Sequence, residues 1–101
     1  MIDRHIVATI KPLSDKPLIY RLYVDDDLIT ERTFIWGDKM CVSENIFVNL
    51  ENGIHSIVAE TIITDPMFGV FENFKITDLS VDGVPIRMNT IESIRNLFIL
   101  E

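Results

Sequence analysis

The sequence contains a single cysteine, Cys41, so no disulfide can form within the chain. Small secreted domains often depend on disulfides, and their absence favours an intracellular folding site. A lone thiol in such a setting is more often buried and inert than reactive, so we expect Cys41 to be buried. Zinc-type Cys/His spacing, a glycine-rich phosphate loop and a nucleophile elbow are also missing. We therefore predict no catalytic residues and no enzyme activity.

Basic residues are scarce: nine of them face sixteen acidic residues, which gives a formal net charge of −7. Nucleic acids and anionic membrane surfaces are bound mainly through clustered Lys and Arg, and here these residues are dispersed. We therefore exclude both as partners. No apolar stretch is long enough to span a bilayer, and the start of the chain lacks the apolar core of a signal peptide.

Hydrophobic residues are abundant, at 48% of the sequence, and they alternate with polar residues along most of the chain. An alternation of period two is typical of β-strands that bury one face. We expect strands at residues 5–10, 18–24, 28–36, 43–50, 54–64, 71–81 and 84–88. Seven or eight short strands with regular turn signals predict one all-β domain over residues 1–101. Its architecture is an antiparallel β-sandwich of jelly-roll or immunoglobulin-like type.

Turn-forming residues divide the expected strands. Residues 25–27 form a tight acidic turn that joins two strands in a hairpin, and residues 82–83 form a last tight turn. Residues 51–53 include Asn-Gly, which favours the positive φ angles of a hairpin bend. The alternation changes phase near Ala59 and Glu60, which predicts a bend or a β-bulge.

The C-terminal segment fits two descriptions. Asn89 is a candidate cap for a short helix, with Glu92 reaching back to it. Alternatively, residues 97–100 close the sheet as a final strand. We expect a turn or one short helix followed by a strand.

Acidic residues at loops are the candidate metal ligands. Calcium requires six to eight oxygen ligands, and clustered carboxylates on a loop can supply several. The alternative is a solvated turn, because Asp is also a favoured hairpin residue. The candidate ligands are Asp25, Asp26, Asp27, Asp65 and Glu72. Calcium is the one cofactor that the sequence raises, and we expect no other.

Aromatic and apolar residues on the outward phase of the strands are the candidate contact residues. Tyr23 and Trp36 are candidate stacking platforms for a ligand, although core packing is the alternative for Trp36. A second apolar face would pack on the C-terminal segment or dock another subunit. Its candidate members are Ile19, Tyr23, Ile35, Phe47 and Ile57.

Two runs, LYVDDDLITERTF at positions 22–34 and ENIFVNLENGIHSI at positions 44–57, resemble small proteins of tailed phages, notably those that infect marine cyanobacteria. The resemblance covers about half of the chain. It implies a virion protein or a virus-encoded accessory protein, located in the virion or the host cytoplasm.

A second resemblance is to calcium-dependent carbohydrate-binding jelly rolls. It depends on Gly53-Ile54-His55 and on the run at positions 72–76 that leads to Val81-Asp82-Gly83. The acidic ligand loop of those proteins is reduced here to Asp65 and Glu72.

Three functions follow from these observations. The first is a non-catalytic structural module, of viral origin, that assembles with a protein partner or as a homo-oligomer. The second is a carbohydrate-binding module, with calcium as its candidate ion. The third is a phage factor that binds and modulates a host protein.

Overall fold

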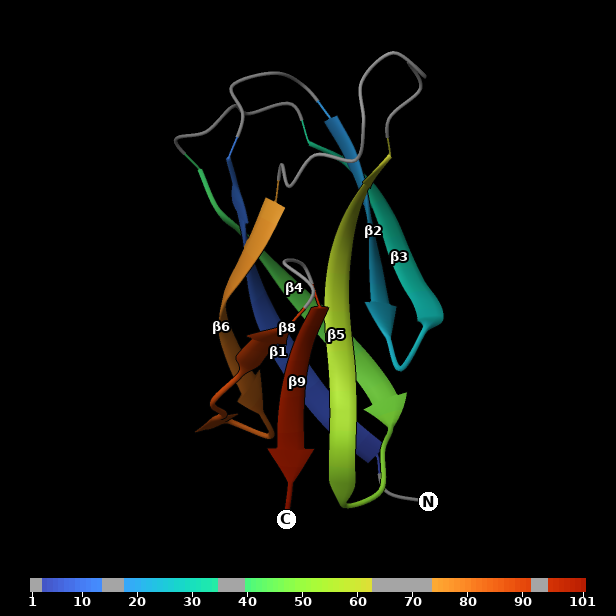
Figure 1. The fold of residues 1–101 in the computed structure, drawn as a ribbon, viewed down its shortest axis with the longest axis vertical. Coiled ribbons are helices and arrows are strands. Elements are labelled where there is room, and N and C mark those ends of the chain that lie inside the picture. The colour runs from blue at the N-terminus through green and yellow to red at the C-terminus, as the bar shows by residue number, and fades with distance from the viewer. Residues whose placement is uncertain (1–2, 14–17, 35–39, 63–73, 92–94) are drawn as a thin grey trace.

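The computed structural model describes residues 3–13, 18–34, 40–62, 74–91 and 95–101, and all regular structure among them is β-strand (Figure 1). In chain order the strands are β1 (Asp3–Pro12), β2 (Leu18–Val24), β3 (Asp27–Phe34), β4 (Val42–Asn49), β5 (Gly53–Ile62), β6 (Phe74–Val81), β7 (Val84–Pro85), β8 (Asn89–Ile91) and β9 (Arg95–Leu100).

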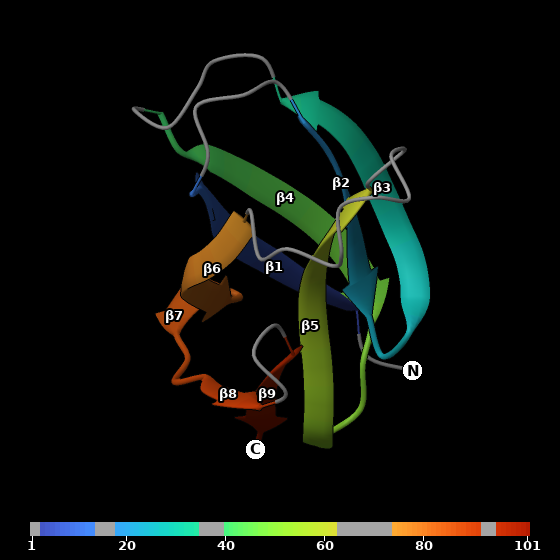
Figure 2. The ribbon, with the colours of Figure 1, turned by 45° about the horizontal axis from the view of Figure 1, so that its top comes forward.

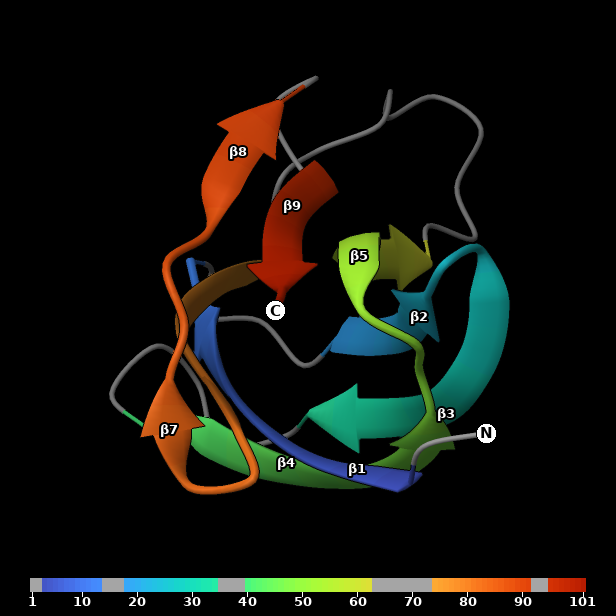
Figure 3. The ribbon, with the colours of Figure 1, turned by 90° about the horizontal axis from the view of Figure 1, so that it is seen from below.

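The strands form two antiparallel sheets that pack face to face. The four-stranded sheet has the order β4-β1-β6-β7, and the five-stranded sheet has the order β3-β2-β5-β9-β8. Figure 3 shows β1 and β4 as one layer, with β2, β5 and β9 in the layer above them. The predicted all-β antiparallel sandwich is confirmed.

The core lies between the sheets and is built mainly from alternate residues of β1, β2, β4, β5, β6 and β9. In β1 these residues are Ile6, Ala8 and Ile10, all fully buried. Val24 of β2 and Ile57 of β5 are register partners, so they point to the same side of their sheet. The remaining buried apolar side chains of the core are Tyr20, Leu22, Ile46, Leu50, Ala59, Phe74, Ile76, Leu79, Val81, Phe98 and Leu100.

Two of the predicted turns are confirmed as two-residue hairpin loops. Asp25 and Asp26 join β2 to β3 with φ angles of 51° and 67°. Asp82 and Gly83 join β6 to β7 with φ angles of 52° and 82°. Positive φ at both loop residues matches the right-handed twist of the flanking strands, and Asp and Gly tolerate it.

The predicted hairpin at residues 51–53 is wrong. Its flanking strands do not pair, because β4 belongs to the four-stranded sheet and β5 to the five-stranded sheet. Gly53 has a φ of 138°, so the local signal for a glycine bend is correct. A bend does not determine which strands pair: β4 pairs with β1, and β5 lies between β2 and β9. The turn therefore carries the chain from one sheet to the other.

Of the bend or β-bulge predicted near Ala59 and Glu60, the bulge is wrong, because β5 keeps a continuous register with β2 and β9. The alternation fails there since residues 56–59 are all buried, two on each face of this central strand. Register shifts occur instead at Leu22/Tyr23 and at Thr9/Ile10.

At the C-terminal end the final strand is confirmed and the helix is not found in the part of the chain that the structure describes. Asn89, the candidate helix cap, begins β8, which pairs with β9. Glu92 lies outside the described residues.

Candidate functional site

The outer face of the five-stranded sheet is unusually apolar. Tyr23 lies on this face because it alternates with the core residues Leu22 and Val24 along β2. Leu28 and Val58 are the register partners of Tyr23 in β3 and β5, so they lie on the same face. The pairing of β5 with β9, and of β9 with β8, extends the same face across the sheet. We define the apolar outer face by its members Tyr23, Leu28, Ile54, Val58, Ile91, Leu97 and Ile99.

Four residues of this face expose large side chains. Ile54 is 71% exposed and its register partner Ile99 is 53% exposed. Leu28, the partner of Tyr23, is 55% exposed, and Ile91 is 40% exposed. A solvated sheet face normally carries polar residues. Contiguous exposed apolar side chains often mark a contact surface, whereas apolar residues that are exposed singly are common on any protein.

An ion pair between β9 and the turn after β2 crosses this face. Arg95 of β9 lies opposite Val58 of β5, and its Nη2 is 3.3 Å from Oδ1 of Asp26 in the turn beyond β2. The Arg95 side chain must therefore extend over the outer side of β5 to reach the turn. The aliphatic part of the Arg95 side chain covers the outer surface of β5, and Asp26 compensates its charge. Ser56 and Val58, which point outward from β5, are accordingly buried.

The acidic turn is held against β5 by Asp25. Its Oδ1 accepts a hydrogen bond from the Ser56 amide at 2.9 Å, and its own amide donates to the Ser56 carbonyl at 3.0 Å. Its Oδ2 lies 2.7 Å from Nδ1 of His55, whose Nε2 lies 2.7 Å from the Glu51 carbonyl oxygen. The imidazole thus lies between a carboxylate oxygen and a backbone carbonyl oxygen. These bonds fix the turn to the sheet.

The candidate calcium ligands do not all lie in one described site. The carboxylates of Asp25 and Asp26 are engaged by His55 and Arg95. Asp65 and Glu72 lie outside the described residues. Among the residues that are described, no three His, Cys, Asp or Glu side chains form a group that could hold a metal ion. The complete five-residue site stays a prediction.

The residues predicted to share an assembly face lie in three places. Ile19 and Tyr23 are half-buried on the outside of the five-stranded sheet, whereas Phe47 lies on the outside of the other sheet. Ile57 is fully buried in the core, so its assignment to an outer face is wrong. The reason is that β4 and β5 belong to different sheets, and the phase of one strand says nothing about the other. Ile35 lies outside the described residues, as does the ligand candidate Trp36.

Sequence reasoning missed most of the apolar outer face. Ile54, Leu97 and Ile99 alternate with the buried residues of β5 and β9, but both phases of these strands are apolar in sequence. Hydrophobicity alone does not distinguish the two sides of such a strand. Only the register against β2, whose outward phase contains Arg21, identifies the exposed side.

The outer face of the four-stranded sheet is polar around one aromatic pair. Phe47 is 80% exposed, and its ring stacks on His5 with centroids 4.7 Å apart and planes 8° apart. His5 Nε2 lies 3.0 Å from Oδ1 of Asn45, which holds the imidazole beneath the ring. Thr9 and Ser43 continue this face as a cross-strand pair.

A buried polar cluster connects the two sheets near β3 and β4. Glu44 of β4 accepts hydrogen bonds from the Tyr20 hydroxyl at 2.5 Å and from Arg32 through two guanidinium nitrogens. Burial favours the neutral acid, but the bonds from Arg32 and Tyr20 and the Arg32 charge outweigh it, so the pKa of Glu44 lies below its ordinary value. Burial, then the hydrogen bond to Glu44, raises the pKa of Tyr20 well above its ordinary value. The cluster is a structural link between the sheets.

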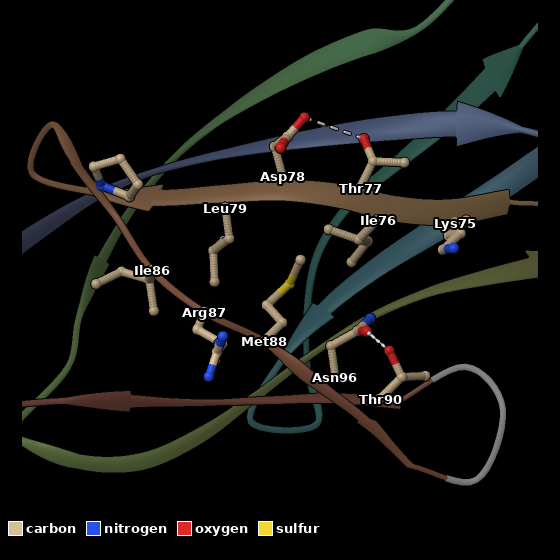
Figure 4. A pocket seen from close by; sticks show the side chains of 11 residues that line it. Lys75, Ile76, Thr77, Asp78, Leu79, Ile86, Arg87, Met88, Thr90 and Asn96 are labelled. Carbon is tan, nitrogen blue, oxygen red and sulfur yellow. Dashed lines mark hydrogen bonds between the residues drawn. The ribbon is translucent and has the colours of Figure 1, made fainter.

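A cleft of about 530 Å³ opens between β6 of one sheet and β8 and β9 of the other (Figure 4). Figure 2 shows the segment that leads from β7 in the four-stranded sheet to β8 in the five-stranded sheet. Ile76 and Leu79 of β6 and Ile86 and Met88 of this segment supply its apolar walls. Opposite them, the Thr90 hydroxyl donates to Oδ1 of Asn96 at 2.7 Å. The remaining lining residues are Lys75, Thr77, Asp78, Pro85 and Arg87.

Cys41 is exposed, so the expectation of a buried thiol is wrong. The residue precedes β4, in a segment outside both sheets.

A comparison with family models, curated proteins and solved structures finds no significant match to this chain. The described residues include no helix with the length and hydrophobicity needed to cross a bilayer.

Proposed function

We propose that this chain is a non-catalytic interaction module that assembles with another protein subunit through the apolar outer face. The observation that carries the proposal is the exposure of Ile54 and Ile99, which are directly opposite each other on neighbouring strands. Burial of two such side chains in a contact is worth about 1.5–3 kcal/mol each. A centre of this kind is typical of the apolar core of a protein interface.

The charges around the face support a second copy of the chain as the partner. Two copies carry like net charge, which opposes association. On this face, however, Arg95 pairs with Asp26, and Arg21 pairs with Glu31 at 2.8 Å. The basic groups there are already compensated, so two such faces meet without a large local field. A two-fold contact also places Ile54 of one copy against the same patch of the other.

The polar clusters of the fold support a non-catalytic role. The carboxylate of Glu44 is nearly inaccessible and is held by Tyr20 and Arg32. The pair formed by His55 and Asp25 fastens a turn. Each of these groups has a structural role, and neither cluster places a nucleophile next to a general base.

The test uses light scattering coupled to size exclusion over a range of concentrations. The double variant Ile54→Thr/Ile99→Thr removes apolar surface while it keeps β-branched residues in both strands. Val84→Thr is the matched control, because Val84 is 57% exposed but lies on β7 of the other sheet.

We expect the unmodified chain and Val84→Thr to form the same oligomer, and the double variant to be a monomer. An oligomer that survives the double substitution would place the interface elsewhere. A monomer at every concentration would refute self-assembly through this face.

Carbohydrate binding is the second candidate function, and the exposed Phe47 ring favours it. An aromatic ring stacked on His5 and flanked by the amide of Asn45 offers a stacking surface with hydrogen-bonding groups beside it. Titration of a panel of neutral oligosaccharides against the chain and against Phe47→Ala tests it. Binding that Phe47→Ala abolishes supports this function, and the absence of heat with every sugar rejects it.

The resemblance to tailed-phage proteins adds a hypothesis about origin. In that setting the oligomer would be a virion or accessory component. The third function, modulation of a host protein, stays a prediction, and it requires the monomer that the scattering experiment would detect.

A further inference from the structure

Among the described residues, little pairs with the edge of β6 that faces the cleft. Strand β7 pairs with β6 only at Ser80 and Val81, and Ile86 donates one further bond to the Leu79 carbonyl at 2.9 Å. In the part of the chain that the structure describes, no strand pairs with residues 75–78 on this side. An edge with unpaired backbone groups is a template for another strand.

The cleft beside this edge has the size and lining for side chains. Its volume of about 530 Å³ lies in the range of natural ligand sites. In Figure 4, Leu79 and Met88 point into the same space, whereas Asp78 points to the other side of β6. A strand added to β6 would direct alternate side chains toward Leu79 and Met88.

Two basic residues, Lys75 and Arg87, line this cleft although the chain as a whole is acidic. Arg87 is exposed and lines the cleft on the side of the β7–β8 segment (Figure 4). A bound group with negative charges at its ends would compensate the charges of Lys75 and Arg87.

We propose that the cleft binds an extended peptide, which pairs with the free edge of β6 and carries apolar side chains flanked by acidic residues. Main-chain hydrogen bonds to β6 supply affinity, and the apolar walls select the alternate side chains. The basic groups select acidic flanks. This site is separate from the apolar outer face, so it does not depend on the assembly proposed above.

The test titrates the ¹⁵N-labelled chain with the synthetic peptide acetyl-Glu-Thr-Val-Thr-Val-Thr-Glu-amide and follows its amide spectrum. Its Glu and Val residues share one face of the extended strand. A peptide N-methylated at both the threonine and the valine amides cannot donate to β6 from either edge, and a peptide with Lys in place of Glu reverses the flanking charges. Lys75→Glu/Arg87→Glu is the protein variant, and both side chains are exposed, so it should fold.

We expect saturable shifts at residues 75–79 and 86–88 with the first peptide. The double variant should weaken its binding by roughly tenfold and favour the Lys peptide, and N-methylation should abolish binding. Ile54→Thr/Ile99→Thr should bind it unchanged.

Three outcomes would overturn the proposal. The first is a spectrum that does not respond to the peptide at millimolar concentration. The second is equal binding of the N-methylated peptide, which would exclude strand pairing. The third is a cleft that responds to dodecanoate and to no peptide, which would make it an amphiphile site.

Discussion

The Tyr20 hydroxyl of one sheet donates a hydrogen bond of 2.5 Å to the Glu44 carboxylate of the other, in the interior of the sandwich. Both side chains are almost completely buried, and Arg32 neutralises the carboxylate from β3. The sheets are therefore joined by a polar contact as well as by apolar packing. Among the described residues, no buried side-chain nitrogen or oxygen lacks a partner, so this contact is fully satisfied.

Removal of the Glu44 carboxylate should destabilise the fold. Glu44→Ala leaves the Tyr20 hydroxyl buried without an acceptor and Arg32 without its counter-ion, and we expect the free energy of unfolding to fall by about 2–4 kcal/mol. Urea unfolding measures it. The matched control is Glu31→Ala, which breaks the exposed pair with Arg21 and should cost at most about 1 kcal/mol. Equal losses in the two variants would show that the buried link contributes nothing special.

The same cluster should make stability depend on pH in the acid range. The pKa of Glu44 is lower in the folded state than its ordinary value of 4.5, so the folded state binds this proton less readily. The stabilisation is present above pH 4.5 and is lost as the pH falls through the folded value. Glu44→Gln lacks the titrating group. Its free energy of unfolding should therefore fall less between pH 6 and 3 than that of the unmodified chain, and parallel curves from urea titrations would contradict this.

Tyr20 should make the stability of the fold depend on pH in the alkaline range. Its pKa is raised in the folded state, so its contribution to stability is complete below its ordinary value of 10.0 and is lost as the pH rises toward the folded value. Tyr20→Phe removes this dependence and leaves the Glu44 carboxylate one bond short at neutral pH. We expect a loss of about 1–2 kcal/mol at pH 7 that shrinks above pH 10. A difference between the two chains that does not change with pH would refute the assignment.

Asp25 should stabilise the β2–β3 hairpin in two ways. Asp25→Ala places an alanine at a φ of 51° and removes the bonds to His55 and to the Ser56 amide. We expect a loss of about 2 kcal/mol in the free energy of unfolding. Asp25→Asn tolerates the same φ and keeps an acceptor for Ser56, so it should lose about half as much. Thermal unfolding of the two variants separates backbone strain from side-chain bonding, and an asparagine as damaging as alanine would contradict the separation.

Cys41 should react in the folded state because its side chain is exposed. We expect a chromogenic disulfide reagent to modify one thiol per chain without denaturant, at a rate close to that of an unfolded control. Cys41→Ser should be as stable as the unmodified chain. Modification that requires urea would show that the thiol is protected.

Much of the secondary structure is a local property of this sequence. Strand β2 begins and ends where its alternation does, at Leu18 and Val24. The loops at Asp25-Asp26 and Asp82-Gly83 follow from residues that tolerate positive φ. These features depend on neighbouring residues only, so pattern and turn chemistry are enough to predict them.

The pairing of the strands is not local, and the errors about turns and elements originate there. Residues 51–53 have the composition of a hairpin loop, yet they connect two sheets, because β4 pairs with β1 and β5 pairs with β2. Asn89 has the composition of a helix cap, yet pairing with β9 makes it part of a strand. Tertiary contacts override weak local preferences in both cases.

The amino-acid sequence by itself determined that the chain forms antiparallel strands, where its tight turns lie and that its net charge is acidic, because these follow from composition and from contacts between near neighbours. Only the tertiary structure decided that Ile57 is in the core while Ile54 and Ile99 are exposed, and that Glu44 meets Tyr20 and Arg32. A strand with apolar residues on both phases has no intrinsic inner side. Its neighbours in the sheet determine that side, and with it the surfaces that remain for binding.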